Sequence, residues 1–244
     1  TTMAYPFPRL KTDGFWHLMP SPGFENQINN IEFSSMSRLR EVCSGAKLDQ
    51  ELFSFLLDPD SRSRLRAVLV ATYFSPEIQP VLLEQGEVNV AAYQYSRELI
   101  KQAAEGVQNW YLDESTDAVR DQGFRKAVVS LYDHRCALCG IRMLTPEGHT
   151  VVEAAHIKPW RKSHDDSPSN GMALCRLCHW SFDEGLMSVG KKYLVMVSRR
   201  VHFEQNLPGH ILTLSDRPMF SPDDPVFQPS QANFEWHRRY LFRD

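Results

Sequence analysis

Four of the five cysteines in this 244-residue chain fall into two pairs with the spacing of metal ligands. The pairs are Cys136/Cys139 and Cys175/Cys178, each with two residues between its members. A C-x2-C pair supplies two sulfur ligands from one tight turn, and two such pairs form the closed four-thiolate shell of a structural zinc. The sequence therefore predicts a structural Zn²⁺ that stabilises the fold and leaves no open coordination position for chemistry.

Two histidines and an asparagine accompany the second cysteine pair. His156 ends an apolar segment, Asn170 precedes a glycine, and His179 directly follows the last cysteine. Imidazole transfers protons near neutral pH and binds metals, since its ordinary pKa is about 6.5. Asp183 lies one helical turn beyond His179, where its carboxylate can accept the free ring N–H. Taken singly, these are ordinary core, surface or turn residues, and His179 could replace a cysteine on zinc; together they indicate an active site.

These side chains need a small set of elements to position them. Periodicity and turn residues predict a helix over 116–132, a strand over 150–157, a polar loop over 158–169, a short helix over 179–184, a hairpin over 186–197 and a final amphipathic helix over 232–241. The strand ends at His156, so the following loop can expose its imidazole. The short helix begins at the second cysteine pair, so the zinc fixes the position of His179.

The first part of the chain has mostly helical signals. A strand is expected over 14–18, and helices are expected from Ser35, Asp49, the two Asp/Ser-Pro starts at 58–59 and 75–76, and residue 89. Gly45 and Gly86 are expected to end two of these helices. The pattern breaks between 106 and 115, which predicts domains over 1–107 and 108–244. The expected fold class is α+β, with a mostly helical domain followed by a zinc-stapled one.

Composition narrows the class of protein. Hydrophobic residues make up 42% and charged residues 23%, which are ordinary globular values. The sequence has neither an apolar run long enough for a transmembrane helix nor a secretory signal, so we expect a cytoplasmic protein without a membrane partner. The net charge is −3, so binding to DNA would have to depend on local patches.

The segment from Cys136 to Val189 resembles an HNH endonuclease domain, the ββα-metal fold, in its four-cysteine zinc form. The motifs that carry this resemblance are AAHIKPW, SNGMALCRLCH and FDEGLMSV. The late helix with Glu235–Arg239 also resembles the C-terminal end of such proteins. The resemblance implies a DNA endonuclease that uses one divalent cation, Mg²⁺, Mn²⁺ or similar.

The resemblance also implies roles for the three motif residues. His156 would be the general base that takes a proton from the attacking water, and His179 would bind the cation at the scissile phosphate. Asn170 would either complete the metal shell or orient His156. Many HNH enzymes have a metal ligand immediately before the base, where this chain has Ala155, and Glu153 is expected on the strand face opposite His156. We therefore expect water to complete the cation's shell.

The N-terminal segment from Tyr5 to Trp16 resembles the opening of sulfur-binding domains, which precede HNH domains in type IV, modification-dependent restriction endonucleases. The run from Leu48 to Phe74 continues this likeness. In that family the domain recognises a phosphorothioate, in which sulfur replaces a non-bridging oxygen of the DNA backbone. Because sulfur is softer and less hydrated than oxygen, an apolar pocket is expected to prefer it.

Several residues are candidates for contact with DNA. Pro59 is the candidate for the sulfur pocket, although helix capping alone also explains it. The candidates for base or phosphate contacts are Arg9, Arg62, Lys158, Arg161 and Lys162, and a solvated surface is the alternative for each.

Three functions remain open on the sequence alone. The first is an endonuclease for phosphorothioate-modified double-stranded DNA, and the second is an HNH nuclease for unmodified or methylated DNA. The third is a zinc-containing DNA-binding module without catalysis, which Ala155 favours. Cutting both strands with one site per chain would suggest a homodimer.

Overall fold

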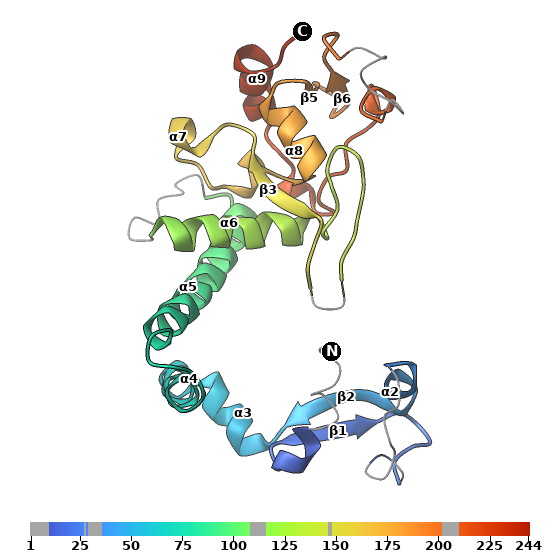
Figure 1. Cartoon of the computed structure of the whole chain (residues 1–244). Helices are drawn as coiled ribbons and strands as arrows, with labels where there is room; N and C mark the ends of the chain where they lie inside the picture. The colour runs from blue at the N-terminus through green and yellow to red at the C-terminus, as the bar shows by residue number, and fades with distance from the viewer. Residues whose placement is uncertain (1–9, 27, 29–35, 108–115, 146–147, 202–209) are drawn as a thin grey trace. The chain divides into compact units, whose positions relative to one another are not determined.

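The computed structural model describes residues 10–26, 28, 36–107, 116–145, 148–201 and 210–244 (Figure 1). The chain forms two compact units, Thr1–Leu83 and Glu84–Asp244. Helices alternate with small antiparallel sheets, each of two strands, so the expected α+β class is confirmed. None of the helices within these ranges is long and apolar enough to cross a membrane.

The N-terminal unit combines a short hairpin with helices. Its elements are η1 (Leu10–Asp13), β1 (Trp16–Pro20), α2 (Met36–Val42), β2 (Cys43–Leu48), α3 (Gln50–Leu57) and α4 (Pro59–Tyr73). Asp49 and Asp58 cap α3 and α4 by accepting backbone N–H groups, as their sequence positions predict. Strand β2 was not expected from the sequence, because Gly45 suggested a helix end. It forms because it pairs with β1, where Gly45 lies opposite Met19.

Helix α5 (Gln79–Ala104) begins in the first unit and ends in the second. It runs through Gly86, where the sequence suggested a break between two helices. A glycine inside a helix costs only about 1 kcal/mol relative to alanine, which packing of the remaining turns can offset. Ala92, Tyr95 and Leu99 of α5 are buried in the core of the C-terminal unit, which explains why the units divide within α5 and not after residue 107.

The C-terminal unit contains a ββα arrangement. Its elements are α6 (Asp117–Leu131), β3 (Val152–His156), α7 (Trp160–Ser163), η2 (Pro168–Asn170), β4 (Gly171–Cys175), α8 (Arg176–Asp183), β5 (Met187–Val189), β6 (Val195–Val197), η4 (Leu212–Leu214), η5 (Pro225–Phe227) and α9 (Gln231–Tyr240). The hairpin β3–β4 pairs His156 with Gly171 and leads directly into α8. Helix α6 packs against β3 and β4, and α8 packs against β3, β4 and β5.

The core of this unit is centred on the β3–β4 hairpin. Helix α6 approaches β4 so closely that a Cβ atom on Gly171 would lie 2.5 Å from Cγ2 of Val128. Phe124 of the same helix also borders this position, so glycine is required where helix and strand meet. The buried side chains therefore fix the end of β3, where His156 lies.

Helix α9 supports α8 through a buried histidine. The His237 ring stacks on Phe182 of α8, with ring centroids 3.6 Å apart. Its Nδ1 is 2.9 Å from the Ser188 hydroxyl, and its Nε2 is 3.0 Å from the Phe182 carbonyl oxygen. Burial lowers the pKa of His237 to about 4, although the bond to the Phe182 carbonyl opposes this shift. The ring is therefore neutral in the folded protein at pH 7.

We expect this histidine to make folding stability depend on pH. The unfolded chain binds a proton at His237 below pH 6.5, whereas the folded protein does so only near pH 4. Stability should therefore fall as the pH drops from 6.5 towards 4, by about 3 kcal/mol for this group. Urea unfolding of the wild type and His237→Phe across this range tests it. The difference in unfolding free energy between the two proteins should change with pH, and parallel profiles would contradict the assignment.

Candidate active site and zinc-binding cluster

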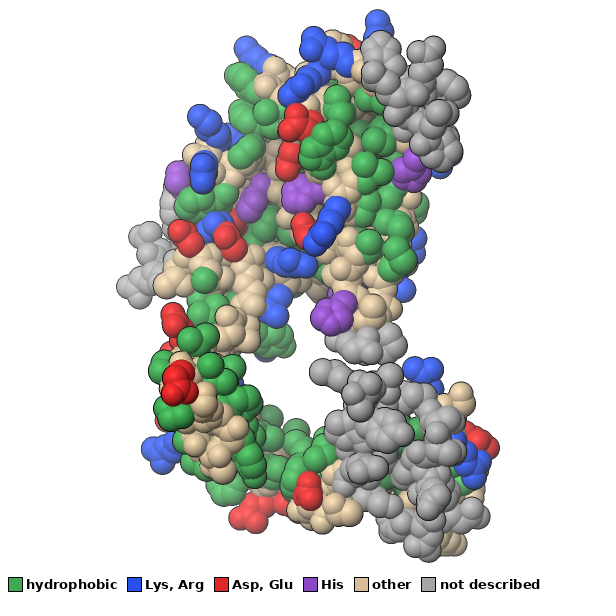
Figure 2. Space-filling model, viewed as in Figure 1, with side chains coloured by type: hydrophobic (Ala, Val, Ile, Leu, Met, Phe, Trp, Pro, Cys, Tyr) green, Lys and Arg blue, Asp and Glu red, His purple; other side chains and the backbone are tan. Residues whose placement is uncertain are grey.

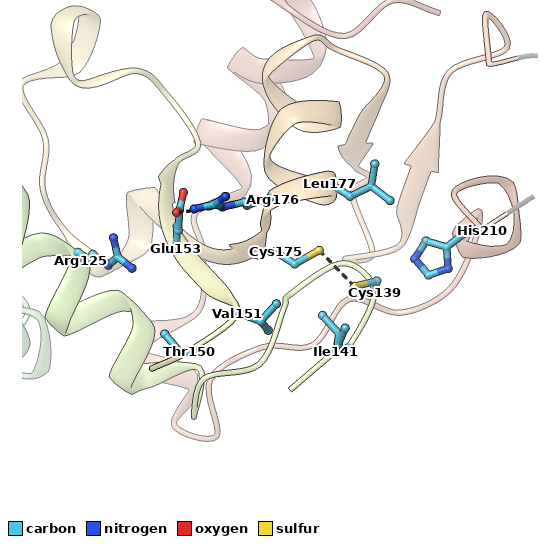
Figure 3. A pocket seen from close by; sticks show the side chains of 11 residues that line it. Arg125, Cys139, Ile141, Thr150, Val151, Glu153, Cys175, Arg176, Leu177 and His210 are labelled. Carbon is cyan, nitrogen blue, oxygen red and sulfur yellow. Dashed lines mark hydrogen bonds and ion pairs between the residues drawn. The ribbon is translucent and has the colours of Figure 1, made fainter. Parts of the chain in front are cut away.

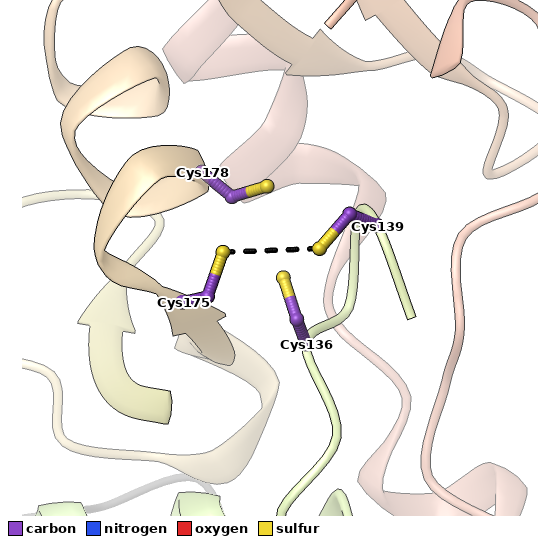
Figure 4. Close-up of side chains that lie close together, drawn as sticks. All are labelled: Cys136, Cys139, Cys175 and Cys178. Carbon is purple, nitrogen blue, oxygen red and sulfur yellow. Dashed lines mark hydrogen bonds between the residues drawn. The ribbon is translucent and has the colours of Figure 1, made fainter. Parts of the chain in front are cut away.

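The two cysteine pairs come together in the structure as the sequence predicts. The ligand atoms of Cys136, Cys139, Cys175 and Cys178 all lie within 4.8 Å of one another (Figure 4). The Cys139 and Cys175 sulfurs are 3.7 Å apart, close to the separation of about 3.8 Å that tetrahedral Zn–S bonds of about 2.3 Å require. The donors and their geometry therefore fit a structural zinc ion.

Each cysteine pair sits on a turn that the local sequence favours. In the first, the Gly140 N–H donates to the Cys136 carbonyl oxygen at 2.9 Å, and Gly140 has a φ of 76°. A Cβ atom there would lie 2.4 Å from Phe220, so only glycine fits. In the second, Cys175 ends β4 and caps α8, and Cys178 lies in its first turn. A zinc ion bound here would fix the start of α8 to the end of β4.

His156 lies at the end of β3 in a network of polar side chains. Its Nε2 is 2.7 Å from Oδ1 of Asp166, a residue that is only 2% exposed. The Tyr95 hydroxyl donates to Asp166 Oδ2 at 2.9 Å, and Arg120 Nη1 donates to both carboxylate oxygens at 3.0 Å. The imidazole also stacks on Phe124, with centroids 3.9 Å apart and planes 5° apart. Strand β3, the loop that carries Asp166 and helix α6 together thus fix the position of the His156 ring.

Asn170 holds the loop between β3 and β4. Its Oδ1 accepts from the Lys158 N–H at 2.9 Å, and its Nδ2 donates to the carbonyl oxygens of Lys158 and Asp165 at 3.0 and 2.9 Å. The side chain is fully buried, and these backbone groups occupy both ends of its amide. The hydrogen bonds of the Asn170 amide thus go to the backbone of the loop that carries Asp166.

His179 lies on α8 between two carboxylates. Its Nδ1 is 3.8 Å from Oε2 of Glu153 on β3, and its Nε2 is 3.5 Å from Oδ2 of Asp183. Asp183 is therefore at ion-pair distance from His179, although the expected hydrogen bond from the ring N–H is not formed, and Glu153 joins from the neighbouring strand. Burial raises the pKa of Asp183, and the Glu184 charge adds to this shift while His179 opposes it. One imidazole and two carboxylates are ligand types that suit a divalent cation.

A surface cavity of about 860 Å³ borders this group (Figure 3). Ile141, Leu177 and Val151 supply apolar walls, and Arg125, Arg176 and Glu153 supply charged ones. Arg176 Nε is 3.7 Å from Oε1 of Glu153. Histidine side chains gather on the face of the unit that carries β3, α7 and α8 (Figure 2). Basic groups and histidines therefore share one surface with the candidate cation ligands.

The candidate DNA contacts occupy different environments. Arg161 and Lys162 are exposed on α7, which interrupts the expected loop. Lys158 Nζ lies 5.9 Å from the centre of the Trp236 ring. Pro59 is exposed at the start of α4, and Arg62 Nη1 donates to the Leu56 carbonyl oxygen at 2.8 Å. The remaining candidate, Arg9, lies outside the described residues.

The side chains that surround His156 were not expected from the sequence. Asp166 lies in a polar stretch beside Asp165, and nothing in the sequence distinguishes a buried carboxylate from an exposed one there. Tyr95 and Arg120 come from helices far away in the chain. The only signal in the sequence was the acidic pair Asp165 and Asp166, which lies between His156 and Asn170.

The comparisons with known proteins identify the module. A family model described as HNH endonuclease matches residues 136–190. The chain is similar to a solved structure described as a modification-dependent TagI restriction endonuclease, at 26% identity with a TM-score of 0.37. The match covers 57% of this chain and spans 42% of that protein's length. No curated protein matches the chain. Residues 136–190 therefore match an HNH endonuclease domain.

Proposed function

We propose that this protein is a modification-dependent endonuclease that hydrolyses DNA near phosphorothioate-modified sites. The observation that carries the catalytic part is the placement of His156 at the end of β3 and of His179 between Glu153 and Asp183, inside an HNH domain. The specificity for sulfur rests on the resemblance of the N-terminal segment to sulfur-binding domains. The third possibility, a module without catalysis, fits poorly with a histidine held so firmly by buried partners.

The proposed reaction begins with water at the scissile phosphate. His156 accepts a proton from this water as its oxygen attacks phosphorus in line. The P–O3′ bond then breaks, and the products are a 5′-phosphate and a 3′-hydroxyl after the 3′ oxygen takes up a proton from solvent. Asn170 acts by holding the loop next to the base, since its amide is bound to backbone groups on both sides.

His179, Asp183 and Glu153 would hold the divalent cation. When bound, the cation stabilises the charge that develops on the phosphate and on the leaving 3′ oxygen. The alanine at position 155 has no atom that could bind the cation. Residues 153 and 155 share one face of a strand, so Glu153 can supply the missing ligand from two positions earlier. His179 is kept between both carboxylates, which favours one orientation of its ring.

Recognition of DNA is divided between local patches. Lys158, Arg161 and Lys162 lie on or beside α7, immediately after the strand that ends at His156. In this proposal their positive charges contact backbone phosphates. Pro59 and Leu57 are exposed where α3 meets α4, and Leu57 is 65% exposed. Such apolar surface suits a poorly hydrated sulfur atom. The partner is double-stranded DNA, and a homodimer would bring one site to each strand.

A comparison of matched duplexes tests this function. With Mg²⁺ or Mn²⁺ present, we expect cleavage of a duplex that carries one phosphorothioate linkage, and tighter binding to it than to the same sequence without sulfur. The tighter binding should be weakened by Pro59→Asp, which puts a charge at the proposed sulfur contact, and not by Asp133→Asn, a change in another unit. Gel shifts and gel-resolved products measure binding and cleavage separately.

The outcomes separate the three functions. Equal binding and cleavage of both duplexes would show a nuclease that does not recognise the phosphorothioate. Such a nuclease would either recognise a different modification or cleave unmodified DNA. Binding without cleavage, with either cation, would show a DNA-binding module. Cleavage that survives complete removal of divalent cations would contradict the proposed role of His179, Asp183 and Glu153.

A further inference from the structure

Asp166 is a buried carboxylate whose partners are all part of the site around His156. At 2% exposure it would destabilise the fold if its charge were left without partners. Its Oδ1 contacts the His156 Nε2 and Arg120, and its Oδ2 contacts Tyr95 and Arg120. Hydrogen bonds from three elements therefore converge on one side chain that lies next to the proposed base.

The Asp166 carboxylate decides which ring nitrogen of His156 carries the proton. An ionised carboxylate only accepts hydrogen bonds, so the imidazole nitrogen 2.7 Å away must be the donor. In neutral imidazole the other nitrogen then has the lone pair. We propose that Asp166 is the positioning residue of the reaction, which holds His156 as its Nε2–H tautomer and presents Nδ1 to the attacking water. This inference rests on the proposed role of His156 as the general base.

The charge state of this group supports the assignment. Burial raises the pKa of Asp166, but hydrogen bonds with His156 and Arg120 outweigh it and leave the pKa below its ordinary value. Burial and the Asp166 charge together raise the pKa of Tyr95, so its hydroxyl remains a donor. At neutral pH, Asp166 is therefore an anion that accepts from His156, Tyr95 and Arg120.

The side chains around His156 restrict its ring, so the ring has little freedom to form a different hydrogen bond. Phe124 stacks on one face of the ring. Arg120 is itself held, with its guanidinium 4.0 Å from the centre of the Trp160 ring and in contact with Asp121. The charged or titratable groups linked to the imidazole through these contacts are Asp166, then Tyr95 and Arg120, and beyond Arg120 its partners Asp117 and Asp121.

The proton balance of the step follows from this arrangement. As the water oxygen bonds to phosphorus, one of its O–H bonds breaks and the proton moves to Nδ1. His156 becomes an imidazolium that keeps its Nε2–H, and the Asp166 carboxylate stabilises this cation without taking a proton. The imidazolium then loses the Nδ1 proton to solvent. Asp166 thus acts through His156 and has no contact with the substrate.

The direct test substitutes Asp166→Asn. Both carboxylate oxygens have two donors, but the imidazole can exchange tautomers whereas Arg120 remains a donor. The asparagine oxygen should therefore take the place of Oδ2, beside Tyr95 and Arg120, and its NH2 group should then face Nε2. This favours the wrong tautomer, and an equivalent change in serine proteases lowers kcat about 10⁴-fold. We expect kcat for DNA cleavage to fall by about 10²–10⁴-fold with little change in KM.

Controls separate this role from a purely structural one. Tyr95→Phe removes one hydrogen bond but keeps the carboxylate, so it should lower kcat much less than Asp166→Asn. Asp133→Asn removes a surface ion pair with Arg142 in the same unit and should leave kcat unchanged. A folded Asp166→Asn protein with wild-type kcat would overturn the proposal.

A spectroscopic measurement on the wild-type protein tests the tautomer of His156 directly. It does not depend on whether the Asp166→Asn variant folds. In the ¹⁵N NMR spectrum of the wild-type protein at neutral pH, the histidine signals that disappear in His156→Ala should show a protonated Nε2 and an unprotonated Nδ1. The reverse pattern would overturn the proposal even if Asp166→Asn does not fold. If His156→Ala cleaves DNA normally, the proposed function fails instead, whatever the tautomer.

Discussion

Replacing His156 by alanine is expected to lower the rate of DNA cleavage by about 10²–10⁴-fold, the usual contribution of a positioned general base. The methyl group that remains cannot accept the proton of the attacking water. Binding of DNA should be retained, because His156 is only partly exposed and the candidate phosphate contacts lie on α7. Single-turnover cleavage together with a gel shift measures both properties on one preparation.

The control for this variant is His149→Ala. His149 is an exposed histidine of the same unit that lies outside the β3–β4 hairpin, so its loss should leave cleavage unchanged. Loss of binding in His156→Ala would point to a contact with DNA or a folding defect. Wild-type cleavage rates would exclude His156 as the base.

Removing the second cysteine pair should have the largest effect on stability. Cys175→Ser/Cys178→Ser deletes two of the four sulfurs, and zinc in isolated modules contributes on the order of 10 kcal/mol of folding energy. This is comparable to the whole stability of a typical domain, at about 5–15 kcal/mol. We expect the C-terminal unit to lose its cooperative thermal transition and its bound zinc together, as calorimetry and metal analysis would measure.

Cys43→Ser is the matched control. Cys43 is also buried, but it lies in the N-terminal unit, where its thiol donates to the Gly45 carbonyl oxygen at 2.9 Å. A serine hydroxyl can make the same bond, so the zinc content should not change and the loss of stability should be small. If the double variant kept the wild-type Tm without zinc, the cysteine cluster would have no structural role.

Local signals made much of this fold predictable. The caps at Asp49, Asp58 and Thr116 start helices where the sequence places them, since a side-chain acceptor beside free N–H groups acts within one turn. The cysteine pairs are equally local, because each lies within one tight turn. The strand that ends at His156 was predicted from its β-branched and apolar residues, and the hairpin was predicted from the two runs that flank Gly190.

The predictions that failed concern features that depend on contacts between distant parts of the chain. Strand β2 exists because β1 supplies its hydrogen-bond partners, and Gly86 stays helical because later turns of α5 are packed. The burial of Asp166 depends on Tyr95 and Arg120, whose nearness no spacing in the sequence reveals. The motif named His156 from sequence alone, whereas the side chains that orient it emerged only from the packing.

The continuity of α5 has a practical consequence for dissecting the protein. A nuclease fragment cut at the boundary that the sequence suggested, residue 108, would lose Ala92, Leu99 and Tyr95. It would expose the apolar side of α6 and remove a donor from the carboxylate beside His156. A fragment that begins near Glu84 keeps all three, so the cut belongs inside the helix, where chain composition offers no linker to mark it.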